Sequence, residues 1–277
     1  MGTSVIIRTI AAVSFLVLCA ALFIGCGSRS GSGSAPSSAG TETATAGRGD
    51  EIVAEFLRRE DAPFRKQRVR FTVAEESEPL KVYEIDSWRK KTNASTLTMT
   101  EIISPTDDKG LGSLTIEENN KSTVVVTYAQ SRGEFRETDT NKMFFGGLTG
   151  GELLGEWAKF DYRYIGEKDI AGVKTWEVEA KLKPDINSIA SKMTINFRTD
   201  TYQPAELHLF DPNGREIRIY RIVEFKNVGD KWYAAKTDVE NPVYKARITI
   251  EILSREYPAS IEDAIFSRER LKQISGK

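Results

Sequence analysis

The sequence predicts a mainly β protein of the α+β class, with one antiparallel sheet of about 11–13 strands and a few short helices covering one face. Segments from Arg68 to Tyr257 alternate apolar and polar residues with the period of two that places neighbouring side chains on opposite faces of a strand. Short turn sequences rich in Asn, Gly, Pro and Asp separate these segments. Because consecutive strands joined by short turns pair antiparallel, we expect a single barrel-like sheet.

The N-terminus carries the pattern of a lipoprotein signal peptide over residues 1–25. The apolar stretch Ile10–Ile24 follows Arg8 and is too short for a comfortable membrane span, which favours a secretory signal. The sequence Leu-Phe-Ile-Gly-Cys at 22–26 resembles the lipobox of bacterial lipoproteins, in which the cysteine is lipidated and the chain is cut just before it. We therefore expect lipidation at Cys26. The alternative is a plain signal peptide with an incidental cysteine.

Residues 26–49 are predicted to hold the lipidated cysteine and a flexible tether, and residues 50–277 the folded domain. The stretch 27–49 is mostly Gly, Ser, Ala and Thr, which cannot bury a core. Cys19 would leave with the signal peptide, so the mature chain would have no cysteine pair for a disulfide. The 39 basic and 40 acidic residues are interspersed, which gives no electrostatic case for a nucleic-acid partner.

The folded domain is expected to begin with an amphipathic helix capped by Asp50. Its apolar residues fall on one side of the helix: Ile52, Val53, Phe56 and Leu57. Asp61-Ala62-Pro63 would end it. A helix placed before a sheet can plug the concave side or act as a lid, and both interpretations stay open. Further short helices are expected over 152–157, over 185–190 and after Ala259.

The most regular stretch, Met193–Tyr257, predicts five antiparallel strands in succession. Alternation of apolar and polar residues is clear from Met193 to Phe197, and Asp-Pro-Asn-Gly at 211–214 is a strong turn signal. A long sheet with one apolar face has to bury that face against other parts of the protein or against a ligand. What covers this face therefore decides the function.

The segment Met143–Leu154 predicts a mobile loop that leads into a short helix. It combines large apolar residues, among them Phe144 and Phe145, with four glycines. It lacks the Gly-Lys-Ser/Thr ending of a phosphate-binding loop. The loop either packs over one end of the sheet or gates a pocket, and the sequence favours neither.

No catalytic residue, metal site or cofactor is predicted. His208 is the only histidine and no thiol would be free, so a zinc site of the usual His/Cys type cannot form. His208 also lies between two leucines, with its side chain on the opposite face from theirs, which argues against a Ser-His-Asp triad. The adjacent pairs Asp107-Asp108 and Glu117-Glu118 need no acid/base role, because neighbouring carboxylates point to opposite faces on a strand and are solvated in a turn. A hydrolase built from carboxylates alone stays an alternative without a supporting motif.

Seven short segments carry a family resemblance through their order and spacing: Ile103–Gly110 (ISPTDDKG), Phe144–Gly147 (FFGG), Tyr162–Glu167 (YRYIGE), Asp200–Ala205 (DTYQPA), Phe210–Gly214 (FDPNG), Trp232-Tyr233 and Ile265–Ser267 (IFS). With these segments, the chain from about Ile52 to Leu271 resembles the LolA-like outer-membrane lipoprotein-sorting family, in its broad uncharacterised branch. The resemblance implies an incomplete antiparallel barrel, a half-barrel, whose concave face is covered by helices and receives lipid chains or the lipid moiety of a lipoprotein. It also implies that the protein is not an enzyme and uses no cofactor.

The resemblance also bears on where the protein acts. The sorting carrier of this family is a free periplasmic protein, whereas Cys26 predicts an anchored one. Gly27 follows Cys26, and the absence of Asp there favours the outer membrane. We therefore expect a lipid-anchored protein of the bacterial envelope that faces the periplasm, with lipid acyl chains or lipoprotein cargo as ligand. An envelope transport partner would fit this role.

The expected function is binding and transfer of lipid or lipoprotein, and the alternative is an envelope sensor or scaffold that binds a protein partner through the same fold. Alternation alone places one set of apolar side chains on the lipid-facing wall: Phe71, Leu97, Met99, Val124, Val126, Met193, Ile195, Phe197, Ile217, Ile219, Ile248 and Ile250. Phe144 and Phe145 would lie at the mouth of the cavity. Arg221 interrupts the apolar row, and sits either at a bulge or sheet edge or against a lipid headgroup.

Overall fold

The computed structural model describes residues 39–76, 78–118, 121–143 and 145–275, which belong to the unit Ser38–Lys277. Within this part of the chain, thirteen strands form one antiparallel sheet: β1 (Phe64–Glu75), β2 (Lys81–Lys91), β3 (Ser95–Ser104), β4 (Gly112–Glu118), β5 (Val124–Ala129), β6 (Glu134–Thr138), β7 (Phe160–Ile170), β8 (Val173–Leu182), β9 (Lys192–Arg198), β10 (Pro204–Phe210), β11 (Glu216–Val228), β12 (Lys231–Asn241) and β13 (Ala246–Glu256).

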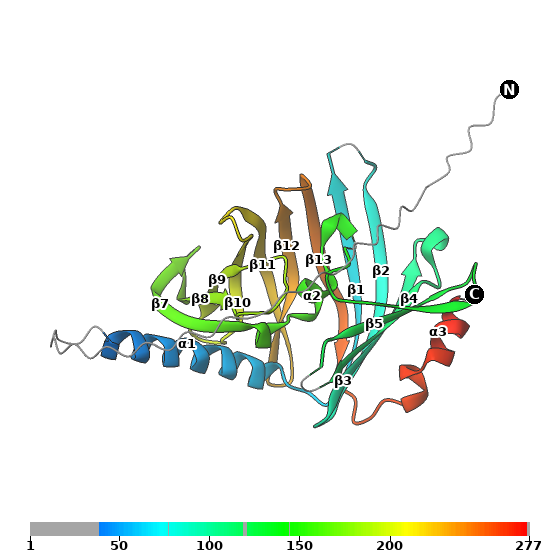
Figure 1. Ribbon diagram of the computed structural model, residues 1–277, viewed down its shortest axis with the longest axis horizontal. Coiled ribbons are helices and arrows are strands. Elements are labelled where there is room, and N and C mark those ends of the chain that lie inside the picture. Colours follow the sequence, from blue (N-terminus) through cyan, green and yellow to red (C-terminus); the bar gives the residue numbers. More distant parts are fainter. Residues whose placement is uncertain (1–38, 77, 119–120, 144, 276–277) are drawn as a thin grey trace, which may run out of the picture. The chain divides into compact units, whose positions relative to one another are not determined.

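The sheet consists of two meanders joined by the pairing of β1 with β13. The strand order is β6-β5-β4-β3-β2-β1-β13-β12-β11-β10-β9-β8-β7, so β6 and β7 form the two edges (Figure 1). The edges do not pair with each other, and the sheet remains an open half-barrel. The predicted fold class, the number of strands and the five-strand meander β9–β13 are therefore confirmed.

The turn between β10 and β11 shows why the sequence specifies this meander locally. Asp211 Oδ1 accepts hydrogen bonds from the backbone N–H groups of Asn213 (2.9 Å) and Arg215 (3.0 Å). Gly214 follows with φ of +77°, a left-handed conformation that glycine adopts without strain. The Asp-Pro-Asn-Gly signal therefore acts through its own side-chain and backbone geometry.

Three α-helices and four short 3₁₀ turns complete the described residues: α1 (Ala39–Glu60), α2 (Gly150–Leu154), α3 (Arg268–Ser275), η1 (Thr106–Asp108), η2 (Phe145–Gly147), η3 (Trp157–Lys159) and η4 (Asp263–Phe266). The prediction that the first helix starts at Asp50 is wrong, since α1 begins at Ala39 and includes eleven residues assigned to the tether. Docking of the helix against β7 outweighs the weak helix propensity of Gly47 and Gly49. Leu57, expected on its apolar side, is 40% exposed.

The helix predicted over residues 185–190 is also absent. These residues form a turn and irregular backbone, and Asp185 has φ of +63°, which is incompatible with a right-handed helix. The segment is short, and nothing in it supplies enough hydrogen bonds to offset the cost of helix nucleation. The expected helix after Ala259 is present as η4 and α3.

Strand register defines two faces of the sheet. A run of directly paired residues crosses one face from β1 to β7: Val73, Ile248, Val239, Tyr220, Leu207, Ile195, Val178 and Tyr164. We call this the inner face. A second run, on the opposite or outer face, crosses from β1 to β6: Lys66, Trp88, Met99, Leu114, Val126 and Glu137. Because directly paired residues point the same way, each run stays on one face.

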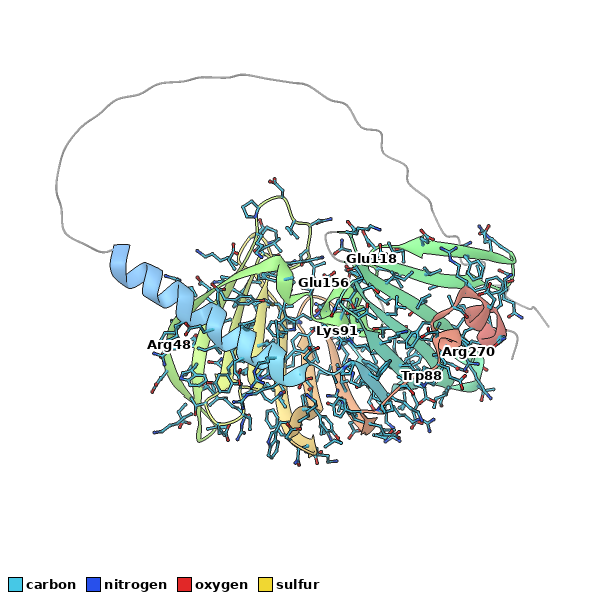
Figure 2. All side chains as sticks on the ribbon, turned by 90° about the horizontal axis from the view of Figure 1, so that it is seen from below. Arg48, Trp88, Lys91, Glu118, Glu156 and Arg270 are labelled. Carbon is cyan, nitrogen blue, oxygen red and sulfur yellow. The ribbon has the colours of Figure 1, made fainter. Side chains whose placement is uncertain are left out.

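Helices cover different parts of the two faces. On the inner face α1 packs on β7–β9, and the segment between β6 and β7 crosses the middle of the sheet. On the outer face α3 packs on β4 and β5, and its Leu271 and Ile274 join Met99 in a separate apolar core. Figure 2 shows Trp88 and Arg270 beside α3, and Arg48 on α1 far from them. The sheet therefore buries apolar side chains on both faces.

The centre of the outer face is covered by cross-strand ion pairs. Arg68 Nε lies 2.7 Å from Asp86 Oδ1, and Arg221 Nη1 lies 2.9 Å from Glu240 Oε1. Arg221 also pairs with Glu206. The interruption of the apolar row at Arg221 is therefore an outer-face ion pair, and the structure gives no support for a headgroup contact there.

Candidate functional site

The candidate site is the inner face together with the segments that cover it. A pocket of about 160 Å³ opens between β9–β11, the loop around α2 and residues 188–190. Its lining is mostly apolar and includes Trp157, Met193 and Leu209, with Glu152 and Glu156 as acidic members. Ligand pockets commonly measure roughly 300–1,000 Å³, so this space is too small for a long acyl chain. The inner face is closed in this structure.

Helix α1 closes the part of the inner face formed by β7–β9. Its buried residues Ile52, Val53 and Phe56 fall on one helical stripe, and the Phe56 ring lies 5.0 Å from the ring of Trp157 and 5.7 Å from that of Phe197. Gly49 continues the stripe. A Cβ atom added to Gly49 would lie 2.8 Å from the backbone of Tyr162 and Arg163, so α1 approaches β7 more closely than any other residue would allow.

The segment between β6 and β7 closes the middle of the inner face. Leu148 is fully buried there, in a cluster with Phe71, Val73 and Ile248. Gly146 has φ of +58°, and a Cβ atom at this position would lie 2.8 Å from the Ile248 side chain. A glycine is therefore required both for the backbone conformation and for the close approach to β13. Of the two interpretations of this loop, the structure shows the packed arrangement.

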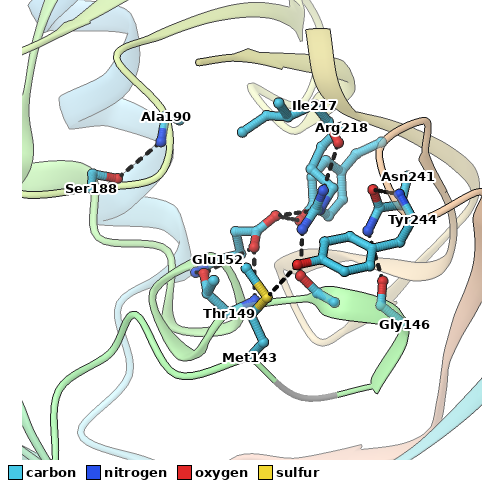
Figure 3. Close-up of polar contacts among 12 residues, drawn as sticks. Met143, Gly146, Thr149, Glu152, Ser188, Ala190, Ile217, Arg218, Asn241 and Tyr244 are labelled. Atoms are coloured by element: carbon cyan, nitrogen blue, oxygen red, sulfur yellow. Dashed lines mark hydrogen bonds and ion pairs between the residues drawn. The ribbon is translucent and has the colours of Figure 1, made fainter. Parts of the chain in front are cut away.

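A buried ion pair fastens this loop to the sheet (Figure 3). Arg218 on β11 and Glu152 on α2 have side chains only 2% and 5% exposed, and Nε lies 3.0 Å from Oε1. The Nε–H group finds no hydrogen-bond acceptor among the described residues, whereas Nη1 donates to the Ile217 carbonyl at 2.6 Å and Nη2 donates to the Gly147 carbonyl. One guanidinium thus holds both the helix and the loop.

Glu152 receives further hydrogen bonds that fix its carboxylate. Thr149 donates to Oε2 from its backbone N (2.7 Å) and its hydroxyl (2.9 Å), and Glu152 N donates back to the Thr149 hydroxyl in a capping box. The Tyr220 hydroxyl donates to Oε1 at 2.9 Å. Burial and the nearby Glu152 raise the pKa of Tyr220 well above its ordinary value, so the phenol stays a donor.

Asn241 at the end of β12 and Tyr244 in the β12–β13 connection hold the other end of the loop. Asn241 Nδ2 donates to the Gly146 carbonyl at 2.7 Å, while its Oδ1 accepts from the backbone N of Tyr244 at 3.1 Å. The Tyr244 hydroxyl lies 3.1 Å from Met143 Sδ (Figure 3). The loop is therefore tied to β11 and to the β12–β13 connection by polar contacts, and opening it requires that these contacts separate.

Seven of the predicted lipid-facing residues contribute to the inner-face cores. Met193, Ile195, Phe197 and Ile217 are buried in the core with α1. Phe71, Ile248 and the partly buried Ile250 belong to the core around Leu148. The structure brings these residues together as one apolar surface across β1 and β9–β13.

Five of the predicted residues lie on the opposite face. Leu97, Met99, Val124 and Val126 are in the outer-face core beneath α3. Ile219 pairs with His208, and its neighbours Arg218 and Tyr220 point inward. Their placement together with Phe71 is therefore wrong. Alternation shows which residues of one strand share a face. When both faces of the sheet are covered, it does not show whether the apolar rows of two strands lie on the same face.

For three of the predicted site residues the structure describes no side chain. Cys26 and Phe144 lie outside the described residues, and Phe145 begins η2 without a described side chain. Sequence reasoning missed the ion pair of Arg218 with Glu152. A signal for it exists, because Thr149-x-x-Glu152 has the spacing of a capping box and Arg218 is a charge within an apolar strand.

The described residues contain no candidate for a metal site or for a membrane-spanning helix. No group of three or more His, Cys, Asp or Glu side chains in this part of the chain is arranged to bind a metal. No described helix has the length and apolar character needed to span a bilayer. His208 lies on the outer face between Glu206 (3.4 Å) and Glu216 (2.6 Å).

Comparisons with known proteins agree with this architecture. A family model described as "-like: Uncharacterized protein" matches residues 94–273, more than half of the chain. No curated protein matches the sequence. A DUF1329 family protein from Desulfovibrio piger has a similar fold, with a TM-score of 0.76, 14% identity, and coverage of 82% of this chain and 99% of its own.

Two further solved structures share the fold. One is a domain from Vibrio parahaemolyticus whose name proposes outer-membrane lipoprotein sorting, with a TM-score of 0.75, 16% identity, and coverage of 82% of this chain and 99% of its own. The other is a LolA superfamily protein from Nitrosomonas europaea, with a TM-score of 0.63, 13% identity, and coverage of 83% and 98%. Because the family model matches residues 94–273, the chain belongs to the family that this model describes, and the solved structures show that its fold is LolA-like.

Proposed function

We propose that the protein is a periplasmic binding protein that shelters acyl chains, either of a lipid or of a lipoprotein, on its inner face. One observation carries the proposal: the apolar surface across β7–β13 and β1 is covered by a separate helix and a glycine-rich loop rather than by a second sheet. Covers of this kind can move as units while the sheet stays intact. The acyl chain would take the place of Ile52, Val53 and Phe56.

Burial of an acyl chain is large enough in free energy to replace burial of the three α1 side chains. Burial of a 16-carbon chain contributes about 13 kcal/mol before entropy and imperfect packing are subtracted, at about 0.8 kcal/mol per methylene. The three α1 side chains that it would displace contribute roughly 1.5–3 kcal/mol each when buried. An acyl chain can therefore compete with the helix for the same surface.

We further propose that Cys26 is lipidated and tethers the protein to the outer membrane, facing the periplasm. Lipoprotein sorting or lipid transfer at that membrane would place the cargo within reach of the tethered domain. The direct test is mass spectrometry of the full chain purified from membranes: a diacylated Cys26 peptide and co-purifying lipid are expected. An unmodified Cys26 would contradict the anchor, and empty protein that also takes up no fluorescent fatty acid would contradict acyl binding.

A matched pair of glycine substitutions tests whether α1 is the movable cover. Gly49→Ala forces a Cβ atom against the backbone of β7, so α1 has to shift away from the sheet. Gly47→Ala, on the same helix, meets no atom within 4 Å and controls for the higher helix propensity of alanine. Uptake of a fluorescent fatty acid is expected to strengthen in Gly49→Ala, since each 1.4 kcal/mol lost from helix docking tightens the apparent affinity tenfold.

The outcome also separates this function from its alternative. If Gly49→Ala lowers the melting temperature but leaves uptake at the level of Gly47→Ala, then α1 is a permanent part of the core and the proposed exchange is wrong. A stoichiometric protein partner that binds while the inner face stays free of lipid would instead favour an envelope sensor or scaffold.

A further inference from the structure

Three arginines gather on the inner face where β1 begins. Arg65 on β1 is paired directly with Arg89 on β2, and two residues further on Gln67 is paired with Arg255 on β13. Residues 65 and 67 alternate in step with Phe71, so this group shares a face with the apolar surface described above. Like charges directly opposite each other on neighbouring strands destabilise a sheet. The arrangement therefore calls for a compensating group.

Arg255 already has partners that hold it in place. Its Nε and Nη2 donate to Gln67 Oε1 at 3.1 and 2.9 Å, and its guanidinium lies 4.3 Å from the centre of the Tyr233 ring. Nη1 lies 3.8 Å from Glu60 Oε2, and Glu60 in turn accepts a hydrogen bond from Gln203 at 2.9 Å. This arginine is thus fixed with its charge directed towards the same corner as Arg65.

Arg65 and Arg89 have no such partners. Within the described residues neither guanidinium makes a hydrogen bond or an ion pair with a carboxylate. Both side chains are partly buried. Burial, together with the neighbouring Arg255 and Arg89, lowers the pKa of Arg65 to about 10, which still leaves it charged at neutral pH. Two charged guanidiniums that lie directly opposite each other on neighbouring strands, with no acceptor among the described residues, are unusual.

The nearby acidic groups do not neutralise this cluster. Glu60 is engaged by Arg255 and Gln203. Burial raises the pKa of Glu117, whereas Arg89 and Arg65 lower it, so this carboxyl lies within electrostatic reach of both arginines without bonding to either. The Tyr257 hydroxyl is also buried and has no hydrogen-bond partner among the described residues. The corner thus holds unused donors and an excess of positive charge.

We propose that Arg65 and Arg89, supported by Arg255, form a binding site for a phosphate-type anion on the inner face. The planar guanidinium matches a phosphate through two parallel hydrogen bonds, and the anion would remove the repulsion between the paired arginines. Strand register places the arginines on the same face of the sheet as Met193 and Leu209, which line the apolar pocket. The anion can be a lipid headgroup, in which case the inference rests on the proposed acyl binding, or a free phosphate.

The test compares two lipids that differ only in phosphate. The full chain in non-ionic detergent is titrated with fluorescent phosphatidic acid and with diacylglycerol carrying the same chains, and separately with inorganic phosphate by calorimetry. The double variant Arg65→Gln/Arg89→Gln removes the site. The control Arg132→Gln/Arg136→Gln makes the same change in charge at an exposed hairpin, where both arginines lie near Glu134.

Phosphatidic acid is expected to bind at least tenfold more tightly than diacylglycerol, because hydrogen bonds between charged groups contribute enough free energy for a difference of this size. This preference should vanish in Arg65→Gln/Arg89→Gln and persist in the control. The double variant should also melt at or above the temperature of the wild type, because it removes repulsion rather than a bond, and this separates loss of binding from loss of folding.

The remaining outcomes distinguish the two proposals. Equal binding of both lipids, with no binding of inorganic phosphate, would overturn the anion site and leave acyl binding standing. Binding of phosphate alone, lost in Arg65→Gln/Arg89→Gln, would support the anion site with a free anion as its ligand and overturn acyl binding. If no probe binds, both proposals are wrong.

Discussion

Replacement of Arg218 by methionine should loosen the loop over the inner face and destabilise the protein. The change leaves the carboxylate of Glu152, 5% exposed, without its cation. It also removes the donors to the carbonyls of Ile217 and Gly147. Removal of one partner of a buried ion pair typically costs about 3–5 kcal/mol, because the other charge stays desolvated. We expect a loss of this size in the free energy of unfolding.

The double variant Arg218→Met/Glu152→Gln should be more stable than the sum of the two single variants implies. Without Arg218, the neutral amide at position 152 no longer carries an unpaired charge, and Tyr220 and Thr149 still provide hydrogen-bonding groups nearby. Directly contacting residues commonly show an interaction energy of about 0.5–3 kcal/mol in such a cycle. The cycle therefore measures the ion pair itself.

Urea unfolding followed by circular dichroism at pH 7 is the assay, with fatty-acid uptake measured on the same four proteins. Arg221→Met is the matched control, because Arg221 makes exposed ion pairs on the outer face, which contribute about 0–1 kcal/mol. If Arg218→Met costs no more than Arg221→Met, or if the single and double variants are additive, the ion pair does not hold the loop and the reasoning is refuted.

Two further changes probe separate parts of the fold. Leu271→Ala leaves a cavity in the core beneath α3 and should cost about 2–5 kcal/mol in thermal or urea unfolding, with fatty-acid uptake unchanged; weaker uptake at a temperature where the variant is folded would show that the outer core takes part in binding. Backbone N–H groups of Arg215 and Asn213 lower the pKa of Asp211 below 3.8, so its stabilisation is present above that pH and is lost as pH falls through the lower folded-state pKa. The difference in melting temperature between wild type and Asp211→Asn, measured from pH 2 to 7, should therefore be flat above about pH 4.5 and change only below it; a flat difference over the whole range would be inconsistent with this.

Much of the fold could be predicted because its determinants are local. The turn at Asp211–Gly214 uses its own side chain and a glycine with positive φ, and the alternation from Met193 to Phe197 identifies a strand whatever lies around it. The start of α1 was not predictable in this way. Gly49 lowers helix propensity, yet it is the residue that lets the helix dock against β7.

The candidate site likewise has features that local sequence patterns predict and features that they do not. Ile195, Phe197 and Ile248 share the inner face, as alternation predicts, whereas Met99 and Val126 have the same pattern but lie on the outer face beneath α3. The contacts of Leu148 with Ile248 and of Arg218 with Glu152 join residues far apart in the chain. Local patterns mark Glu152 and Arg218 as exceptional residues, but they do not show that the two side chains pair with each other.

The sequence by itself determined the strands, their turns and the antiparallel meander, because each follows from the period of side chains or from backbone conformation. Only the tertiary structure decided which face each apolar row occupies. Both faces are covered, the inner by α1 and the loop around α2 and the outer by α3, so burial alone cannot distinguish them. The tertiary structure also decided that Arg65 lies opposite Arg89. The register between two strands sets which side chains are paired, and alternation within one strand does not contain that information.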